Sequence, residues 1–288
     1  MRNNIKIIED LSLNAWPSHQ MQIYDGWILR FSYFYTHRTN CIEQIGPSSI
    51  PLEDKLDYCE EIYRKWGTPA IYKINPLLDS SFDQKLTERG YHIAHITEVM
   101  AMSLMEHKPV LHSSRVILRK KISPAWLNAL FNMKGTANQI HRTIVPSMYA
   151  AIPKDTIAAY VYDGDKIIGT GLGILDRDYI GLYAIHVDQA YRGHGLGHDI
   201  CQSILDASME YGAASAYLQV VKGNAPAKHF TLPWVFRISI LTGSASNTLY
   251  PLRTTILAKC NICRHKTGEP PSAHFPEKVP RYASVLLF

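Results

Sequence analysis

Hydrophobic and polar residues follow two periods along the first hundred residues, and each period predicts one kind of element. Residues 24–45 are rich in aromatic and β-branched side chains and contain Asp25-Gly26, a pattern typical of strands joined by a tight turn. Residues 52–67 carry apolar side chains at helical spacing and end at Gly67, which predicts a helix closed by glycine. A strand, a short helix and a second strand are then expected over residues 68–74, 79–91 and 92–104.

The rest of the chain repeats this mixture of elements. A strand is expected over residues 115–119, and Ser123-Pro124 is a helix-start signal because serine caps and proline suits the first turn. A helical segment over residues 137–150 is expected to be interrupted or to end near Pro146. Three β-rich runs fill residues 156–188, the first two joined by the hairpin signal Asp163-Gly164-Asp165. A helix over residues 196–211 and a strand over 214–221 follow, so the pattern predicts an α/β (α+β) chain.

The composition agrees with a globular protein of two domains. The chain has 288 residues, 46% of them hydrophobic and 19% charged, which is enough for a substantial core. Residues 105–114 break the pattern and are the expected linker. No apolar stretch is long enough to span a membrane, and the start lacks the features of a secretory signal, so neither is expected. Five scattered cysteines favour a reducing compartment, and we expect a cytoplasmic location.

The positive charge is concentrated at the end of the chain. Residues 228–288 hold eight of the 30 Lys and Arg residues and two of the 25 acidic residues, a net charge of +6, which leaves −1 for residues 1–227. Because residues 1–227 are almost neutral, they offer no concentration of positive charge for a nucleic-acid phosphate backbone, and no nucleic-acid partner is expected. The basic tail is interpreted as a solvated segment in preference to an anion site.

A glycine-rich bend, Arg-Gly-His-Gly-Leu-Gly over residues 192–197, separates a predicted strand from a predicted helix. Helix N-termini expose unpaired backbone N–H groups, and glycines let a ligand approach the backbone, so the bend is suited to a pyrophosphate. A P-loop is excluded because Gly197 is followed by His198-Asp199. The dinucleotide-binding fingerprint is excluded because His198 stands where its third glycine is required.

The pattern Arg-x-x-Gly-x-Gly after the strand Tyr-Ala-Ile-His-Val resembles motif A of the GCN5-related N-acetyltransferase (GNAT) superfamily. The resemblance covers residues 115–227 and includes the following helix, the next strand and Asn224. It implies a mixed, mostly antiparallel central sheet flanked by helices. It also implies acetyl-CoA as the co-substrate and direct acetyl transfer to a primary amine.

The resemblance also implies which residues bind acetyl-CoA. Backbone groups of the strand before the bend would pair with pantetheine, amides of the bend would hold the pyrophosphate with Arg192 at its edge, and Asn224 would lie beside the pantetheine arm. His186 is the candidate catalytic base, although a histidine satisfied within the fold or facing solvent is an equal alternative. The expected cofactor-binding residues are Ile185, His186, Val187, Arg192, Gly193, His194, Gly195, Leu196, Gly197, His198 and Asn224.

The first half is similar to a degenerate repeat of the second half. Residues 85–104 end a helix at Gly90-Tyr91 before a strand, as the family pattern does, but the loop at residues 46–51 reads Gly-Pro-Ser-Ser-Ile-Pro and lacks the glycine bend. We therefore expect a tandem protein, with a degenerate GNAT-like domain at 1–107 and an acetyl-CoA-binding domain at 114–227 whose family pattern would extend to about 248. The first half is expected to shape the acceptor cleft or the interface; a coincidental α/β likeness is the alternative.

The family pattern stops after Ala227. A helix with Leu-Tyr-x-x-x-Gly-Phe is implied there, and its tyrosine gives a proton to the CoA thiolate, but residues 228–246 read KHFTLPWVFRISILTGSAS with Pro233 in the middle. We consider a reading frame in which each codon takes the third base of one present codon and the first two bases of the next. In that frame the codon spanning Phe230 and Thr231 must encode Tyr or His, and the codon spanning Trp234 and Val235 must encode Gly. The shifted frame therefore allows Ala-Leu-Tyr-x-x-x-Gly-Phe. We hypothesise that residues 228–288 are out of frame, through a natural frameshift or a sequencing error.

Two further functions are alternatives at this point: a CoA-binding or regulatory module, and a metal-binding interaction protein built on the tail. Without the tyrosine, the chain could be a CoA-binding or regulatory module that does not turn over. Cys260-x-x-Cys263 with His265 and His274 lacks a second cysteine pair, so no metal site is expected there. A small-molecule or peptide amine is the expected acceptor, and the sequence does not decide which, nor the oligomeric state.

Overall fold

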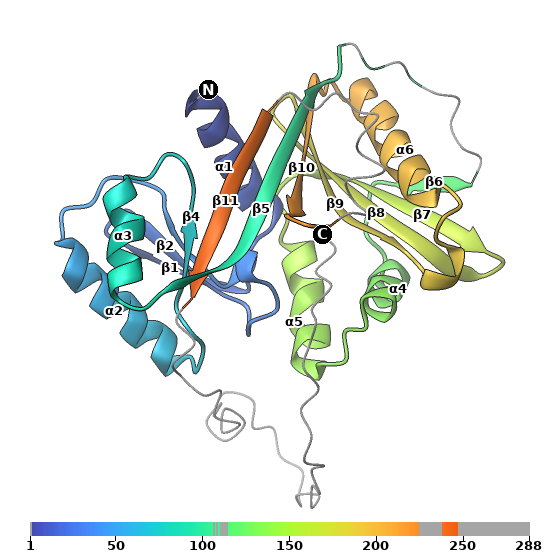
Figure 1. The fold of residues 1–288 in the computed structure, drawn as a ribbon. Helices are drawn as coiled ribbons and strands as arrows, with labels where there is room; N and C mark the ends of the chain where they lie inside the picture. Colours follow the sequence, from blue (N-terminus) through green and yellow to red (C-terminus); the bar gives the residue numbers. More distant parts are fainter. Residues whose placement is uncertain (1, 106, 108, 110–114, 225–237, 247–288) are drawn as a thin grey trace, which may run out of the picture.

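The strands of the protein form one continuous sheet. In the computed structural model the described residues are 2–105, 107, 109, 115–224 and 238–246. Their eleven strands lie in the order β1-β2-β3-β4-β11-β5-β10-β9-β8-β7-β6, with helices packed on the sheet (Figure 1). No helix in these ranges combines the length and apolar character needed to cross a bilayer.

The elements of the first half match the predicted ones, with one addition at the start. Asp25 and Gly26 both have positive φ in the β1–β2 turn, and the Asp79 carboxylate caps α3 by accepting from the amide of Ser81. The elements are α1 (Arg2–Ala15), β1 (Gln20–Tyr24), β2 (Trp27–Phe31), β3 (Ile42–Gln44), α2 (Leu52–Lys65), β4 (Ile71–Ile74), α3 (Ser80–Glu88) and β5 (His92–Ser103).

The second half also matches, except at Pro146 and at β11 (Ile238–Ser246), a strand that the sequence did not predict. Pro146 was expected to interrupt or end a helix, and this was wrong, because α5 runs through it. The apolar face on both sides of Pro146 is buried, and this packing outweighs the lost backbone hydrogen bond. The elements are β6 (Val116–Arg119), α4 (Pro124–Lys134), α5 (Gln139–Ala150), β7 (Asp155–Asp163), β8 (Lys166–Asp176), β9 (Tyr179–Val187), α6 (Leu196–Glu210), β10 (Ser215–Val221) and β11 (Ile238–Ser246).

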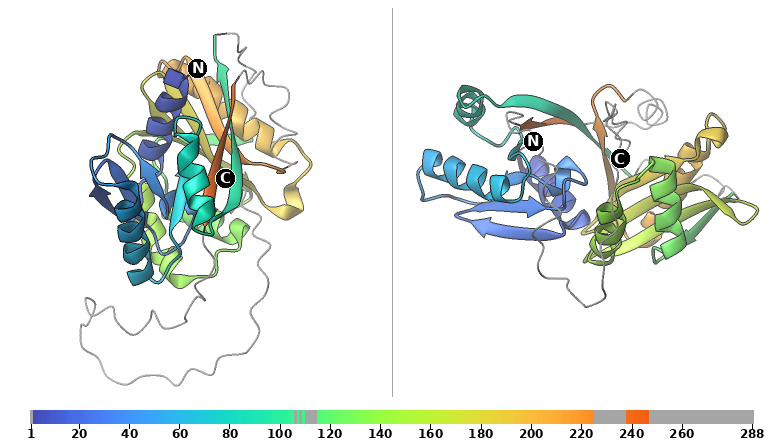
Figure 2. Two further views of the ribbon diagram at one scale, coloured as in Figure 1. Left: turned by 60° about the vertical axis from the view of Figure 1, so that its left-hand side comes forward. Right: turned by 90° about the horizontal axis from the view of Figure 1, so that it is seen from below.

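The helix α1 was not predicted, and it lies where the two halves meet (Figures 1 and 2). Its apolar residues Ile5, Ile8, Leu11 and Ala15 are almost completely buried. They share a core with side chains of α4, α5, β8 and β9. The first residues of the chain therefore contribute to the core of the second half.

The two halves share a topology and exchange one strand. In the first half β1, β2 and β3 are antiparallel neighbours, and α2 leads to β4, which is parallel to β3. In the second half β7, β8 and β9 repeat this, and α6 leads to β10, which is parallel to β9. The next strand of each half pairs with the other half: β5 with β10, and β11 with β4. This exchange makes the sheet continuous across both halves.

In the first half, the loop at residues 46–51 stands where the second half has the glycine bend, and its amides bind a carboxylate of the protein. The loop before α2 turns the amides of Ser49 and Ile50 toward the Asp25 carboxylate, at distances of 2.9–3.0 Å. Lys55, which is buried in the first turn of α2, pairs with the same carboxylate at 3.3 Å. These hydrogen bonds hold the pKa of Asp25 well below its usual range. An internal carboxylate thus takes the position of an external anion, which accounts for a scaffold without a cofactor cradle.

Glycines on one face of β8 set the distance between the sheet and α6. A Cβ on Gly171 would lie 2.3 Å from Cγ2 of Ile200, and one on Gly173 would lie 2.4 Å from Cγ2 of Ile204. Both isoleucines are fully buried. Close packing of α6 on the strands that precede the bend therefore requires glycine at these positions.

We expect Gly171→Ala to lower the free energy of unfolding by about 1–3 kcal/mol, because the new methyl group overpacks the α6–β8 contact. Denaturant unfolding followed by circular dichroism measures this change. Gly46→Ala is the control, since a Cβ there meets only the Cα of Gly26 at 3.7 Å. Equal stability of the two variants would contradict the packing role of Gly171.

Candidate active site

The parallel strands β9 and β10 separate near the middle of the sheet. They pair from Tyr179 and Ser215 as far as Leu182 and Leu218, although β9 continues to Val187 and β10 to Val221. The facing backbone groups beyond that point are not used in the β9–β10 ladder. An extended ligand that carries amide groups can therefore pair with this stretch of β9.

A β-bulge marks the same position. Tyr183 pairs with Leu172 and His186 with Thr170, so two residues of β9 face one of β8. Ala184 has φ of +49°, a conformation that is uncommon for alanine, and its carbonyl accepts from Thr170 Oγ1 at 3.2 Å. The bulge lies where β9 stops pairing with β10 while its pairing with β8 continues, and such bulges are often found beside active sites.

The glycine bend follows β9 and starts α6. Gly195 is the N-cap of α6 with φ of +78°, and Gly193 has φ of +81°, so both positions favour glycine for conformation. Gly197 has no such requirement, and a Cβ on any of the three would meet open space within 4 Å. Amides at the start of a 15-residue helix thus face a volume that the described protein leaves free.

Ion pairs and hydrogen bonds fix the shape of this bend. Arg192 Nε donates to the carbonyl of Val187 at 3.1 Å, which ties the bend to the end of β9. Arg115 forms an ion pair with Asp199 and also donates to the carbonyl of His194. The carbonyls of Val187 and His194 and the Asp199 side chain in the first turn of α6 are thereby engaged within the protein.

The structure distributes the predicted residues between the core and the surface. The side chains of Ile185 and Leu196 are buried in the core under α6, and Val187 packs against it, so only their backbones can meet a ligand. Arg192, Gly193, His194 and Gly195 are exposed, and Gly197 and His198 are partly exposed. The glycine bend follows the strand β9 and leads into α6, as the motif implies.

His186 lies beside the gap but does not line the cavity described below. Its side chain is 5% exposed, and its Nδ1 has no hydrogen-bond partner among the described residues. Burial and, to a smaller extent, the nearby cations Lys134 and Arg192 together lower the pKa of His186 to about 3. The imidazole is therefore neutral at pH 7, as a base must be, although its role stays a prediction.

Asn224 is the last described residue before a gap in the described chain. Its amide donates to the carbonyl of Val221 at 3.1 Å, which forms a turn at the end of β10. The expected position of the Leu-Tyr-x-x-x-Gly-Phe helix, residues 228–235, lies outside the described residues. So do Cys260, Cys263, His265 and His274.

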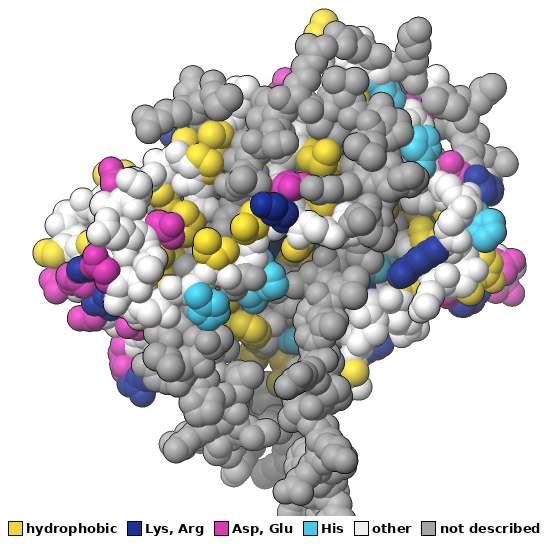
Figure 3. Space-filling view, in the orientation of Figure 1, with side chains coloured by type: hydrophobic (Ala, Val, Ile, Leu, Met, Phe, Trp, Pro, Cys, Tyr) yellow, Lys and Arg dark blue, Asp and Glu magenta, His cyan; other side chains and the backbone are white. Residues whose placement is uncertain are grey.

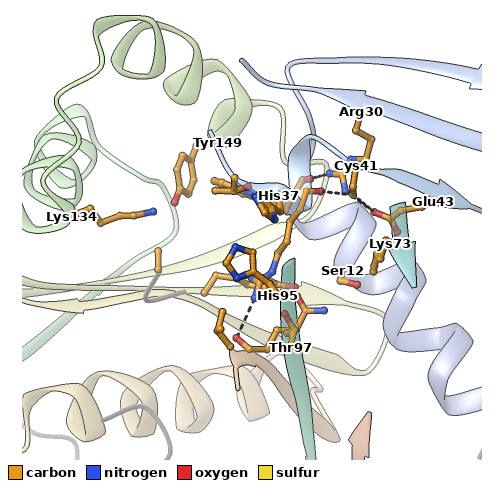
Figure 4. Close-up of a pocket in the computed structure, with 17 residues that line it drawn as sticks. Ser12, Arg30, His37, Cys41, Glu43, Lys73, His95, Thr97, Lys134 and Tyr149 are labelled. Atoms are coloured by element: carbon orange, nitrogen blue, oxygen red, sulfur yellow. Dashed lines mark hydrogen bonds and ion pairs between the residues drawn. The ribbon is translucent and has the colours of Figure 1, made fainter. Parts of the chain in front are cut away.

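A cavity of about 120 Å³ opens where the two halves meet, next to the β9 bulge (Figure 4). On the face drawn in Figure 3, histidines lie together with hydrophobic side chains between the halves, whereas acidic side chains gather over α2 and α3. Both halves supply the walls of the cavity. Its lining includes Ser12, Trp16, Arg30, Thr36, His37, Arg38, Cys41, Glu43, Lys73, His95, Thr97, Lys134, Tyr149, Tyr183, Ala184, Gln219 and Val221.

Two histidines of the first half stand at the centre of this cavity. The rings of His37 and His95 have centroids 4.5 Å apart, and Figure 4 shows both between the β9 side and the Arg30 side. Burial lowers the pKa of His37 to about 4, with a further contribution from His95. His37 is therefore neutral at pH 7 and able to accept a proton.

Buried ion pairs hold one wall in place. Glu43 pairs with Arg30 at 3.2 Å and with Lys73 at 2.9 Å, and Lys73 also pairs with Glu9 at 2.8 Å. Burial alone would raise the pKa of Glu43, but Lys73 and Arg30 hold it below its usual value. These four groups are charged and compensate one another, so they form a rigid wall.

The sequence analysis missed most of this cavity. It expected the first half to shape the acceptor cleft but named none of His37, Arg38 or His95. These residues lie on a short 3₁₀ segment and on the exchanged strand β5, without any spacing that signals a site. Among the described residues no group of three or more His, Cys, Asp or Glu side chains is arranged to hold a metal ion.

Sequence comparisons find two related groups. The family model described as "Probable histone acetyltransferase Rv0428c C-terminal" matches residues 3–237. An uncharacterized N-acetyltransferase of Bacillus subtilis, YobR, is 22% identical over 228 residues, which cover 78% of this chain and 91% of that protein. The family match includes the first half, the bend and the β9–β10 gap.

Structural comparisons find the same architecture. A GCN5-related N-acetyltransferase from Kribbella flavida has a TM-score of 0.62 and 12% identity, covering 85% of this chain and 95% of that one. A tandem GNAT protein from the clavulanic acid biosynthesis pathway has a TM-score of 0.55 and 12% identity, covering 72% and 75%. At such identities the likeness concerns the fold, and it includes a protein with two GNAT halves.

Proposed function

The chain belongs to the GCN5-related N-acetyltransferase superfamily and is an acyltransferase of this type, and from this premise we propose that it transfers an acetyl group from acetyl-CoA directly to a primary amine. One observation carries the proposal. The β9–β10 gap, the Ala184 bulge and the glycine bend follow one another along the chain, and the cavity opens beside them.

The residues of the gap and the bend fit acetyl-CoA. Backbone groups of Ile185, His186 and Val187, which lie beyond the end of the β9–β10 pairing, would pair with its pantetheine amides. The amides from Gly193 to His198 would hold its diphosphate, with Arg192 at the edge, because the space that a Cβ would fill there is open. Acetyl-CoA supplies an activated acetyl thioester when bound. The cavity beside Ala184 would bind the amine.

A neutral histidine is the proposed proton acceptor. An amine attacks only when unprotonated, so a base within the cavity must take its proton. His37 lines the cavity and His186 does not, and both imidazoles are uncharged at neutral pH. Geometry therefore favours His37 as the base, with His186, the candidate from the sequence, as the second choice.

The CoA-binding module without turnover is the second candidate function. It is favoured by the lack of the Leu-Tyr-x-x-x-Gly-Phe segment after Ala227 and by a family match that stops at residue 237. The strand β11 pairs with β4 and β5. This pairing uses backbone groups, which are the same for every amino-acid sequence, so it does not test the reading frame. Resequencing the gene decides the frame, and confirmation of residues 228–288 as printed would refute the frameshift hypothesis.

Release of free CoA thiol distinguishes the two functions. We expect a panel of primary amines to give time-dependent thiol release from acetyl-CoA, detected with a thiol reagent, and amine-dependent acetyl product by mass spectrometry. The frame-corrected chain, assayed in parallel, should be the faster enzyme. Tight binding of radiolabelled acetyl-CoA by both chains without release from either would favour the module instead.

A further inference from the structure

The charges that line the cavity do not balance. Arg30 and Lys73 are matched by Glu43 and Glu9 through the ion pairs of the rigid wall. Two further cations, Arg38 and Lys134, also line the cavity, and within the described part of the chain no carboxylate pairs with either. The cavity therefore holds two positive charges that no described carboxylate compensates.

Each of these cations is held by neutral groups. Arg38 Nη2 donates to the carbonyl of Gln219 at 3.4 Å, just beyond the end of the β9–β10 pairing. Lys134 Nζ donates to the Tyr35 hydroxyl at 3.3 Å and lies 5.1 Å from the centroid of its ring. Neutral partners orient a cation without cancelling its charge.

The protein destabilises these charges in the absence of a ligand. Burial and, to a smaller extent, the nearby guanidinium of Arg38 together lower the pKa of Lys134 to about 8, so the two cations repel each other. Burial likewise lowers the pKa of Arg38. Partly buried cations of like sign with no acidic partner among the described residues are the usual arrangement of a site that binds an anion.

We propose that the acceptor amine carries an anionic group, a carboxylate or a phosphate, which Arg38 and Lys134 bind. This inference rests on the proposed function, because it identifies the class of amine that enters the same cavity. Figure 4 shows Lys134 extending toward Tyr149 and His37 from one side of the cavity. An anion held by the two cations would place an attached amino group within the same small cavity as His37.

The same charges disfavour acceptors that are only cationic. A diamine would bring a second ammonium group into a cavity with two uncompensated positive charges, which is repulsive. An amino acid or a phosphorylated amine supplies the missing negative charge. The structure therefore favours acceptors of this class over polyamines.

Matched amines test the proposal. The pairs are lysine and 1,5-diaminopentane, 4-aminobutyrate and butylamine, and phosphoethanolamine and ethanolamine; the last pair separates phosphate from carboxylate. We expect the anionic member of at least one pair to have a kcat/KM at least tenfold higher, through KM. Arg38→Gln and Lys134→Gln should each remove most of this preference, and Arg38→Lys should restore part of it. Lys120→Gln, an exposed lysine that does not line the cavity, is the control.

Three results would overturn the proposal: no preference in any pair, a preference that survives both substitutions, or an Arg38→Gln effect confined to the Kd of acetyl-CoA. The last would assign the cations to the cofactor. Calorimetric binding of the same pairs to the CoA-loaded protein keeps the test valid if no amine turns over. Selective binding of the anionic member without turnover supports the anion site while the transferase proposal fails.

Discussion

Gly197→Val is expected to raise the Kd of acetyl-CoA about a hundredfold while leaving the fold intact. Gly197 lies in the first turn of α6, needs no left-handed conformation and has open space where its Cβ would be. A branched side chain there would fill the space in front of the helix amides and remove hydrogen bonds to a charged diphosphate, at a cost of about 3 kcal/mol. Isothermal titration calorimetry with acetyl-CoA measures the change.

Glycine at the other end of the same helix is the matched control for this experiment. Gly195 and Gly212 flank α6, have φ of +78° and +85°, and leave open space for a Cβ. Valine at either position should lower the free energy of unfolding by about 1–2 kcal/mol. Only Gly195→Val should also weaken acetyl-CoA binding. An unchanged Kd of acetyl-CoA in both Gly195→Val and Gly197→Val would refute the proposal that the bend binds the diphosphate.

His37→Gln is expected to lower kcat about a hundredfold, with a much smaller change in KM. Glutamine keeps the size of the side chain but cannot take a proton, so the variant loses the contribution of a general base. Steady-state kinetics at saturating acetyl-CoA measures the effect. His95→Gln is the neighbouring control, because its ring contacts His37 and lines the same cavity.

The pH dependence provides a second readout for His37. Its pKa is lowered to about 4, so the neutral form persists as the pH falls and is lost only near pH 4. The ratio of wild-type to His37→Gln kcat should therefore be constant between pH 8 and pH 6. A ratio that falls below pH 7 would contradict this environment. A full loss of kcat in His186→Gln, with His37→Gln unaffected, would make His186 the base.

Local signals in the sequence were sufficient for most elements and for the position of the glycine bend. Caps and turn residues such as Asp79, Ser123 and Asp25-Gly26 act on residues close to them in the chain, so their effects can be predicted from the local sequence. The glycine bend is also local, because one strand, one turn and one helix create it. The helix α1 had a readable spacing at Ile5, Ile8, Leu11 and Ala15 that was not used.

The error at Pro146 has a tertiary cause. Proline removes one hydrogen bond wherever it stands, but the outcome depends on how much apolar surface the helix buries on either side. Ile144, Val145, Met148 and Tyr149 are all buried against the rest of the second half. Packing of that kind is not visible in the local sequence, so the helix continued where the local rule predicted a break.

By itself, the sequence determined the α/β class, the positions of most strands and helices, and the position of the glycine bend between β9 and α6. Only the tertiary structure decided that β5 and β11 exchange between the halves, that Asp25 occupies the counterpart of the cradle, and that His37, Arg38 and Lys134 meet at one cavity. Residues 37 and 134 are far apart in the chain and belong to different halves. Their proximity depends on the long-range strand pairing that joins those halves, and no local pattern encodes it.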